Sequence, residues 1–252
     1  MMSLPPLFQQ DDEGRWWPDP FTQGPYQGLQ GGGVAGLLCA AIEQQAGGEG
    51  WGEIASVATY FLRPTPLDAI ELDVKPIRVG RRVSIVDATL RNRDVIVATQ
   101  RATLITPEHD PSLPTPNTSD LVDPTAFAPL PKHRVRKAEW MWLAQEIRKE
   151  AKDRIWFRPT RKLVAHPVAF AHVLPAADWA HGLGPPTPLR VRPERATPNP
   201  DVVVHFARPP QGEWIGVNWH LTWTQQSVGL GEAKLMDTSG IFGCVSMSVA
   251  IL

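Results

Sequence analysis

The feature that most constrains this chain is an internal repeat with a fixed offset of 145 residues. Phe61-Leu62-Arg63-Pro64 recurs as Phe206-Ala207-Arg208-Pro209, and 206 − 61 and 209 − 64 both equal 145. The same offset pairs Ala88 with Ala233, Leu90 with Leu235, and the turn residue Asn92 with Asp237. Solenoid and propeller units are much shorter, at roughly 20–50 residues. The repeat therefore predicts two copies of one whole domain.

The length and the proline distribution agree with two domains. A chain of 252 residues, 42% of them hydrophobic, fits two units that each bury a core of their own. The 26 prolines cluster in three stretches, 18–25, 107–131 and 185–200, where the interiors of helices and sheets are excluded. We expect an N-terminal unit over residues 1–115, a proline-rich linker over 116–134 and a C-terminal unit over 135–252.

Charge and cysteine content narrow the class of protein. A net charge of −1 argues against a general nucleic-acid binder, which usually has a basic face. Residues 1–15 lack a cationic, apolar signal region, and no apolar run approaches the roughly 20 residues needed to span a bilayer. The two cysteines, Cys39 and Cys244, are predicted to be buried thiols. These features predict a cytoplasmic protein that binds neither nucleic acid nor membrane.

The first unit is predicted to contain one buried helix followed by strands. Residues 34–42 are apolar nearly all round and rich in Ala and Leu, and the glycines at 47, 48 and 50 are expected to end the helix. Residues 70–75 alternate apolar and charged residues, as half-buried strands do, and a polar turn over 91–94 separates the next two strands. Short links make neighbouring strands antiparallel, because a parallel return needs a crossover of a dozen or more residues. The expected strands are 55–62, 70–75, 83–90 and 95–105.

The second unit is predicted to follow the same plan. Apolar spacing over residues 135–154 favours a helix, and 155–159 is predicted to be a strand. Residues 163–179 are interpreted as the second central helix, although Pro175 would kink or interrupt it. The expected final strands are 201–207, 214–224, 228–236 and 241–252. The predicted fold is α+β, with two units joined into one continuous antiparallel sheet and the two helices on one side.

With this repeat in place, the chain resembles the double hotdog acyl-CoA thioesterases of the type II bacterial and peroxisomal kind. The resemblance rests on residues 31–36, which open the first helix, and on Tyr60-Phe61-Leu62-Arg63-Pro64. In the second half it rests on residues 199–201, 205–210 and 212–216. It implies that the fused pair mimics the dimer formed by single-unit relatives, and that two chains could associate into a homodimer of double hotdogs.

The resemblance also implies three residues that hold the attacking water. The family's aspartate at the end of the second central helix corresponds to Asp178. The family's hydroxyl residue before the next strand corresponds to Asn199. The family's glutamine on the last strand corresponds to Ser248, or to Met247 if the alignment shifts by one residue. The family's Gly-Gly-Gln at the first helix is Gly-Gly-Gly here. Two of the three water-holding positions have thus changed type.

The residues themselves allow both a catalytic and a structural interpretation. A thioester is hydrolysed with a carboxylate that takes a proton and with donors aimed at the carbonyl oxygen. Asp178 could do the first, and the backbone amides of Gly32 and Gly33 at a helix N-terminus could do the second. The alternatives are a solvent-exposed helix-end carboxylate and a flexible start of the helix. Asn199 can orient a water but cannot act as a base, whereas Ser248 can donate and accept.

Other chemistries find less support in the sequence. The seven histidines form no His-x-x-x-His pair and no cysteine lies at ligand spacing, so no metal site is predicted. A Gly-x-Ser-x-Gly nucleophile elbow is absent from the sequence. Basic side chains could meet coenzyme A phosphates or form a solvated face. They are Arg78, Arg81, Arg82, Arg91 and Arg93 in one cluster, and Arg134, Arg136 and Lys137 in another.

The function that the resemblance implies is hydrolysis of acyl-CoA to a free acid and coenzyme A, in lipid metabolism and without a cofactor. The alternative is a non-catalytic acyl-CoA or acyl-chain binding protein with a degenerate site, which the changes at Asn199 and Ser248 favour. A third reading, hydration or dehydration of an acyl thioester, normally needs a histidine near the helix, and residues 31–33 offer none.

Overall fold

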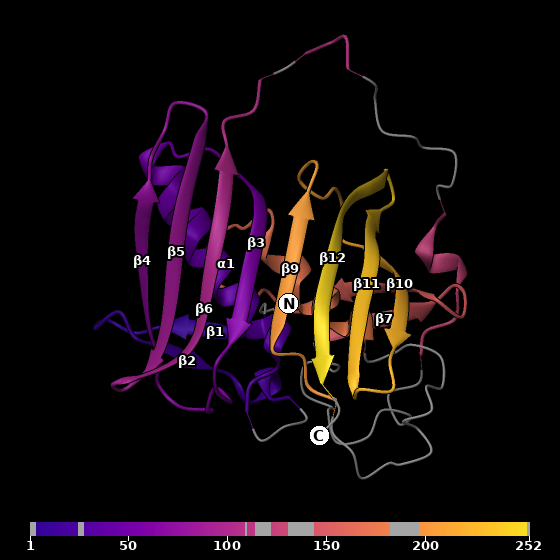
Figure 1. Ribbon diagram of the computed structural model, residues 1–252, viewed down its shortest axis with the longest axis horizontal. Coiled ribbons are helices and arrows are strands. Elements are labelled where there is room, and N and C mark those ends of the chain that lie inside the picture. Colours follow the sequence, from indigo (N-terminus) through magenta and orange to yellow (C-terminus); the bar gives the residue numbers. More distant parts are fainter. Residues whose placement is uncertain are drawn as a thin grey trace.

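Ten strands form one antiparallel sheet in the computed structural model (Figure 1), which describes residues 4–24, 28–108, 110–113, 122–130, 144–181 and 197–250. Across the sheet the order is β4 (Glu71–Arg78), β5 (Val83–Asn92), β6 (Val95–Ile105), β3 (Glu53–Phe61), β9 (Asp201–Phe206), β12 (Gly240–Ala250), β11 (Val228–Asp237), β10 (Ile215–Trp223), β8 (Arg154–Pro159) and β7 (Gln145–Lys149). The predicted α+β architecture with a continuous sheet is confirmed.

The repeat of 145 residues is visible in the strand boundaries. β11 begins and ends 145 residues after β5, since 228 − 83 and 237 − 92 are equal, and β12 lies 145 residues after β6 at both ends. Each hairpin also has a register shift at the corresponding place, after Leu90 in the first copy and after Leu235 in the second. A bulge places two residues opposite one and bends the strand, so the two copies share fine geometry as well as order.

Within the sheet, the two copies meet at the pair of strands β3 and β9. β3 pairs antiparallel with β9 over five residue pairs, from Ser56 opposite His205 to Tyr60 opposite Asp201. The contact continues beyond the ladder, because the amide of Phe61 donates to the carbonyl of Pro200 at 2.8 Å. Residues immediately after β3 and immediately before β9 are therefore neighbours.

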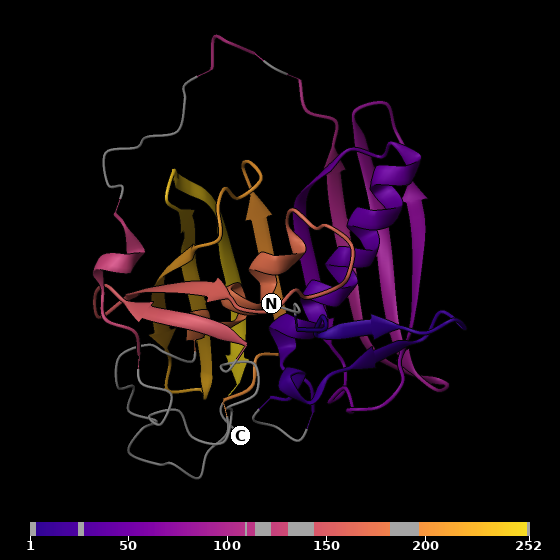
Figure 2. The ribbon, with the colours of Figure 1, turned by 180° about the vertical axis from the view of Figure 1, so that it is seen from behind.

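Helix α1 (Gly31–Glu49) lies across one face of the first copy (Figure 2). Leu37, Leu38 and Ile42 are fully buried against the sheet, as expected for a helix that is apolar nearly all round. The helix is longer than its apolar run. It continues through Gly47 and Gly48, which the sequence predicts as breakers, and ends at Gly50, whose positive φ of 69° suits the left-handed C-cap position.

The second central helix is much shorter than predicted, and the expectation of one helix over 163–179 is wrong. Residues 163–169 form no helix, and three short turns follow: η4 (Ala171–Val173), α3 (Leu174–Ala177) and η5 (Asp178–His181). Pro175 lies in the first turn of α3, where its missing N–H costs nothing. Proline thus sets where this helix begins and prevents its extension toward residue 163.

The prediction of a helix over residues 135–154 is also wrong for the part of this segment that the structure describes. Residues 145–149 form the edge strand β7, in which Gln145 and Ile147 point inward and Glu146 and Arg148 are half-buried. Residues 135–143 lie outside the described part of the chain. In Figure 2 the ribbons of residues 145–159 run across the view, so the sheet curls around at this edge. A short 3-10 helix, η2 (Pro124–Ala126), lies in the predicted linker.

The N-terminal segment forms a small hairpin. β1 (Phe8–Gln10) pairs with β2 (Trp16–Pro18), and the turn η1 (Pro20–Thr22) follows. Phe8 is fully buried, and the amides of Leu7 and Phe8 donate to the carbonyls of Lys162 and Leu163 at 2.9 Å. The segment therefore joins the first copy to the loop before η4.

Two further expectations concern burial. Cys39 is buried in α1, and burial raises the pKa of its thiol well above the usual value. The prediction is wrong for Cys244, which lies exposed on the outer face of β12. Among the described residues, no helix is both long and apolar enough to cross a bilayer.

Candidate active site

Asp178 lies at the junction of the two copies and is buried, with an exposed fraction of 5%. Its Oδ2 accepts from Gln30 Nε2 at 2.7 Å and from the amide of Gly32 at 2.9 Å. Its Oδ1 accepts from Asn199 Nδ2 at 2.8 Å. These donors come from the start of α1 and from the loop before β9. The structure therefore brings Asp178, Asn199 and Gly32 together, and it does not place Asp178 in solvent.

Gln30 connects the carboxylate to the helix. It is the N-cap of α1, and its Oε1 accepts from the amide of Gly33 at 2.7 Å while its Nε2 donates to Asp178. The partial positive charge of the helix N-terminus favours an anion at this position. Charge-assisted bonds to a carboxylate are also stronger than neutral ones. The start of α1 therefore supplies both donors to Asp178 Oδ2 that the structure shows.

The glycines at the start of α1 allow a close approach between helices. A Cβ on Gly32 would lie 2.5 Å from the carbonyl oxygen of Leu174, 2.7 Å from Asp178 Cβ and 2.8 Å from Pro175 Cα. A Cβ on Gly31 would lie 3.1 Å from Asp178 Oδ2. Glycine at 32 is thus required because the backbone of α3 occupies the space of a side chain. Close packing, rather than flexibility, accounts for it.

The amides of Gly32 and Gly33, predicted as donors to the thioester oxygen, both have acceptors within the protein. Gly32 donates to Asp178, and Gly33 donates to Gln30. A substrate oxygen would have to replace one of these acceptors. Their role in binding substrate stays a prediction.

Ser248 lies apart from this cluster, on the exposed face of β12. Its amide and its hydroxyl donate to the two carboxylate oxygens of Asp201, at 2.7 and 3.0 Å. Met247, the neighbouring alternative, faces the core and is 2% exposed. Asn199 links the two groups, since its Nδ2 also donates to the carbonyl of Asp201 at 3.2 Å. Asp201, at the start of β9, therefore anchors the end of β12.

A cavity of about 340 Å³ opens beside Asn199 and Gly31, which both lie next to the Asp178 carboxylate. We call it the seam cavity, because its walls come from both sides of the β3–β9 pair. It is lined by Gly28, Leu29, Gly31, Val34, Phe61, Leu62, Arg63, Pro64, Thr65, Pro198, Asn199, Pro200 and Ala250. Its size and largely apolar lining are typical of small-molecule sites.

Arg63 and Arg208 occupy equivalent positions in the repeat but have different surroundings. Arg208 forms a bidentate pair with the buried Asp237, with distances of 2.6 and 2.9 Å. Burial alone would raise the pKa of Asp237, but Arg208 and the backbone amides of Gln211 and Ser239 offset this and lower it. In the first copy Asn92 stands in place of Asp237. Arg63 consequently forms no ion pair with any described residue, and it lies exposed at the wall of the seam cavity.

A second carboxylate, that of Glu43 in α1, accepts hydrogen bonds from the backbone of the C-terminal copy. Its Oε1 accepts from the amides of Ala169 and Phe170 at 2.7 and 2.9 Å, and its Oε2 accepts from Ala171 at 2.8 Å. Burial raises the pKa of Glu43, although the three amides oppose that shift. Helix α1 thus supplies an acceptor for the start of η4, while the end of α3 supplies Asp178 for the start of α1.

Comparison with protein families gives the chain an assignment over nearly its whole length. A model described as the acyl-CoA thioesterase N-terminal domain matches residues 17–105, and a model of the acyl-CoA thioesterase C-terminal domain matches residues 107–250. The chain belongs to the acyl-CoA thioesterase family. Comparison with curated protein sequences finds no significant match.

Solved structures show the same fold at low sequence identity. A hot dog fold protein of unknown function from Alicyclobacillus acidocaldarius is 14% identical, with a TM-score of 0.75 over 96% of this chain and 95% of that one. The tesB protein of Mycobacterium avium subs paratuberculosis is 18% identical, with a TM-score of 0.70 over 97% and 95%. Acyl-CoA thioesterase II TesB2 from Mycobacterium marinum is 14% identical, with a TM-score of 0.65 over 97% and 94%. The expected double hotdog fold is confirmed.

Two residues of the site were missed from the sequence. Gln30 is an uncommon N-cap, and its bond to Asp178 spans 148 residues, so no local pattern indicates it. Arg63 belongs to the repeat, and the replacement of Asp237 by Asn92 in the first copy is the sequence signal that its acidic partner is missing. Of the predicted basic clusters, Arg82 pairs with Glu108, and residues 134, 136 and 137 lie outside the described residues. No group of three or more metal-ligating side chains occurs within the described ranges.

Proposed function

We propose that this acyl-CoA thioesterase family member hydrolyses acyl-CoA at the seam cavity, with Asp178 as the group that orients and deprotonates the attacking water. The observation that supports this most directly is a buried carboxylate that accepts from Gln30, Gly32 and Asn199, the last of which lines the cavity. Burial among fixed donors aligns a base without the reorganisation that a solvated side chain would require.

The proposed reaction is a direct hydrolysis. Water adds to the thioester carbonyl carbon while Asp178 takes its proton, and the carbon–sulfur bond then breaks. Coenzyme A leaves as the thiol after it receives the proton, and the acyl group leaves as the free acid. Asn199 cannot take a proton, so in this proposal it only positions the carboxylate and the water. No step requires a metal or a redox cofactor.

Arg63 supports coenzyme A as the leaving group. It is a cation without an acidic partner among the described residues, and it lies at the wall of the seam cavity near the protein surface. Arginine binds phosphate through paired N–H donors. We propose that it meets a phosphate of coenzyme A while the acyl chain enters between Val34 and Phe61.

The test is thiol release from short, medium and long acyl-CoAs by wild type, Asp178→Asn and Asp201→Asn. Loss of a general base costs about 10²–10⁴ in rate, so Asp178→Asn should lose at least a hundredfold in kcat. Asp201→Asn is the matched control, because Asp201 is also an aspartate that accepts from neighbouring residues but lies on the exposed face with Ser248. Equal rates for wild type and Asp178→Asn would contradict the mechanism.

A second candidate, an acyl-CoA binding protein without turnover, is favoured by one observation. Both amides at the start of α1 that could polarise the thioester are occupied by Asp178 and Gln30. Tight acyl-CoA binding in a calorimeter, with no thiol release from any chain length, would select this function. The cytoplasmic location, the role in lipid metabolism and a homodimer stay predictions from the sequence.

A further inference from the structure

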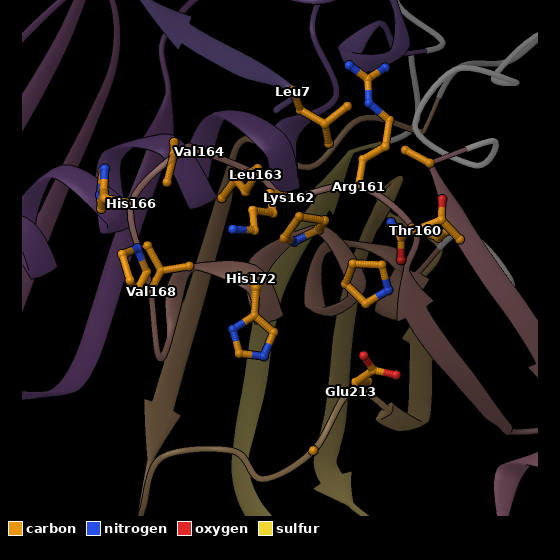
Figure 3. Close-up of a pocket in the computed structure, with 16 residues that line it drawn as sticks. Leu7, Thr160, Arg161, Lys162, Leu163, Val164, His166, Val168, His172 and Glu213 are labelled. Atoms are coloured by element: carbon orange, nitrogen blue, oxygen red, sulfur yellow. The ribbon is translucent and has the colours of Figure 1, made fainter. Parts of the chain in front are cut away.

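A second cavity of about 480 Å³ lies in the C-terminal copy (Figure 3). It is lined by the loop between β8 and η4, the start of β7 and Gly212 and Glu213, and we call it the loop cavity. None of its lining residues belongs to the seam cavity. Its volume falls within the range of about 300–1,000 Å³ typical of ligand sites. It is therefore a separate place where a small molecule fits.

The walls of the loop cavity are mainly apolar. Leu7, Leu163, Val164, Val168 and several prolines face it. Leu7 belongs to the N-terminal segment, which is fixed here by the bonds from Leu7 and Phe8 to Lys162 and Leu163. Figure 3 shows Leu7, Leu163 and Val164 along one side of the cavity. An occupant must therefore have a hydrocarbon part.

One buried polar group in this apolar wall has no hydrogen-bond partner in the described part of the chain. Gln145 is 5% exposed, and its Nε2 forms no hydrogen bond with any described residue. A buried donor left unsatisfied costs about 1–3 kcal/mol. Pro159 lies opposite Gln145 in the β7–β8 ladder. A ligand that offers an acceptor to Gln145 Nε2 would remove this cost.

The charges around the loop cavity point to a single negative charge on that ligand. Lys162 is exposed at the edge and forms no ion pair with any described residue. Arg161 is already bound to Asp19 and to the carbonyl of Pro5. Burial lowers the pKa of His172, which disfavours the cationic form of its imidazole. In Figure 3, Glu213 lies at the opposite end of the view from Leu7. Its Oε2 pairs with Arg158 Nη1 at 3.6 Å. One free cation and one free amide donor match a carboxylate better than a phosphate.

We propose that the loop cavity binds an aliphatic carboxylate, with its carboxylate group between Gln145 Nε2 and Lys162 and its chain against Leu163, Val164 and Val168. The amide supplies the missing hydrogen bond, the ammonium supplies the charge, and the apolar walls take the chain out of water. Binding at this site does not depend on thioester hydrolysis at Asp178.

Calorimetric titration of the full chain with decanoate tests the proposal, with Asp178→Asn used throughout to separate the two sites. Decanoate should bind saturably to wild type and equally well to Asp178→Asn. Gln145→Leu should weaken binding about tenfold, the effect of losing a hydrogen bond to a charged group. Lys162→Met should weaken it about threefold, and Lys152→Met, an exposed lysine outside the cavity, should leave it unchanged. Decylammonium, with the same chain and the opposite charge, should not bind.

Filling the cavity provides a second measurement that does not depend on Gln145. Val168 is half-buried in the loop, and Val168→Trp should abolish decanoate binding while the unfolding midpoint stays near that of wild type. The proposal is overturned if decanoate does not bind saturably, if decylammonium binds as well as decanoate, or if Gln145→Leu and Val168→Trp both bind decanoate like wild type. Loss of decanoate binding in Asp178→Asn alone would place the ligand in the seam cavity instead.

Discussion

Replacing Gly32 with alanine tests the close packing on which the proposed active site depends. The added Cβ would lie 2.5 Å from a backbone oxygen, that of Leu174, and 2.8 Å from Pro175 Cα. Backbone cannot rotate away as a flexible side chain can, so α1 and α3 must separate. That separation stretches the bond of 2.9 Å from the Gly32 amide to Asp178. Both stability and turnover should fall.

The magnitude follows from three effects. Overpacking a buried site costs about 1–3 kcal/mol, and a lost hydrogen bond to a charged group costs about 1.5–3 kcal/mol. Alanine regains about 1 kcal/mol over glycine as a helix former. Gly32→Ala should therefore destabilise the protein by about 2–4 kcal/mol.

Gly48→Ala is the matched control, because Gly48 lies in the same helix and an added Cβ would meet nothing within 4 Å. It should stabilise the protein by about 0.5–1 kcal/mol. Urea unfolding followed by tryptophan fluorescence measures both variants, and thiol release from acyl-CoA measures turnover. The reasoning is refuted if Gly32→Ala is as stable as wild type, or if the two substitutions shift the free energy of unfolding in the same direction.

Three further predictions concern single side chains. Asp237→Asn should cost about 3 kcal/mol at neutral pH because it breaks the pair with Arg208. The pKa of Asp237 is lowered on folding, so the difference in free energy of unfolding between wild type and variant is largest above the usual pKa of 3.8. This difference should narrow as the pH falls through the folded pKa, as urea titrations at several pH values would show. Arg63→Gln should leave the unfolding midpoint unchanged but lower kcat/KM for acyl-CoA about fivefold and weaken its salt dependence, whereas an unchanged kcat/KM would remove Arg63 from substrate binding. Gln30→Leu should cost about 2 kcal/mol through the lost cap and lower kcat as well, and a stable variant with full kcat would show that Gln30 does not position Asp178.

The strands could be predicted from the sequence because their signal is local and occurs twice. The segments 83–90 and 95–105 flank a polar turn, and the fixed offset places their copies at 228–235 and 240–250, within two residues of the predicted 228–236 and 241–252. The helices were less predictable. Apolar spacing suggested a helix through 145–149, yet those residues form an edge strand because β8 pairs with them. Such pairing depends on the neighbouring strand and cannot be read from spacing alone.

The candidate site was predictable only in part, for a physical reason. Asp178 and Asn199 lie near ends of predicted elements, where the family resemblance placed them, and their side chains are hydrogen-bonded to each other. Their role in holding the attacking water stays a prediction. Gln30 could not be found in this way, because its role depends on how closely α1 approaches α3. Ser248 was placed on the correct strand, but which face its side chain occupies depends on register, and a shift of one residue reverses the face.

The unequal helices have a consequence for how the two halves could diverge. Two identical chains related by a two-fold axis must present the same helix and the same cavities on both sides. Here the halves belong to one polypeptide, and one carries a helix of 19 residues while the other carries three short turns. Because the two copies are fused in one chain, no symmetry requires their helices or their cavities to be the same. One half could keep a long helix to hold a carboxylate, and the other could lose most of its helix and open a cavity in the space released.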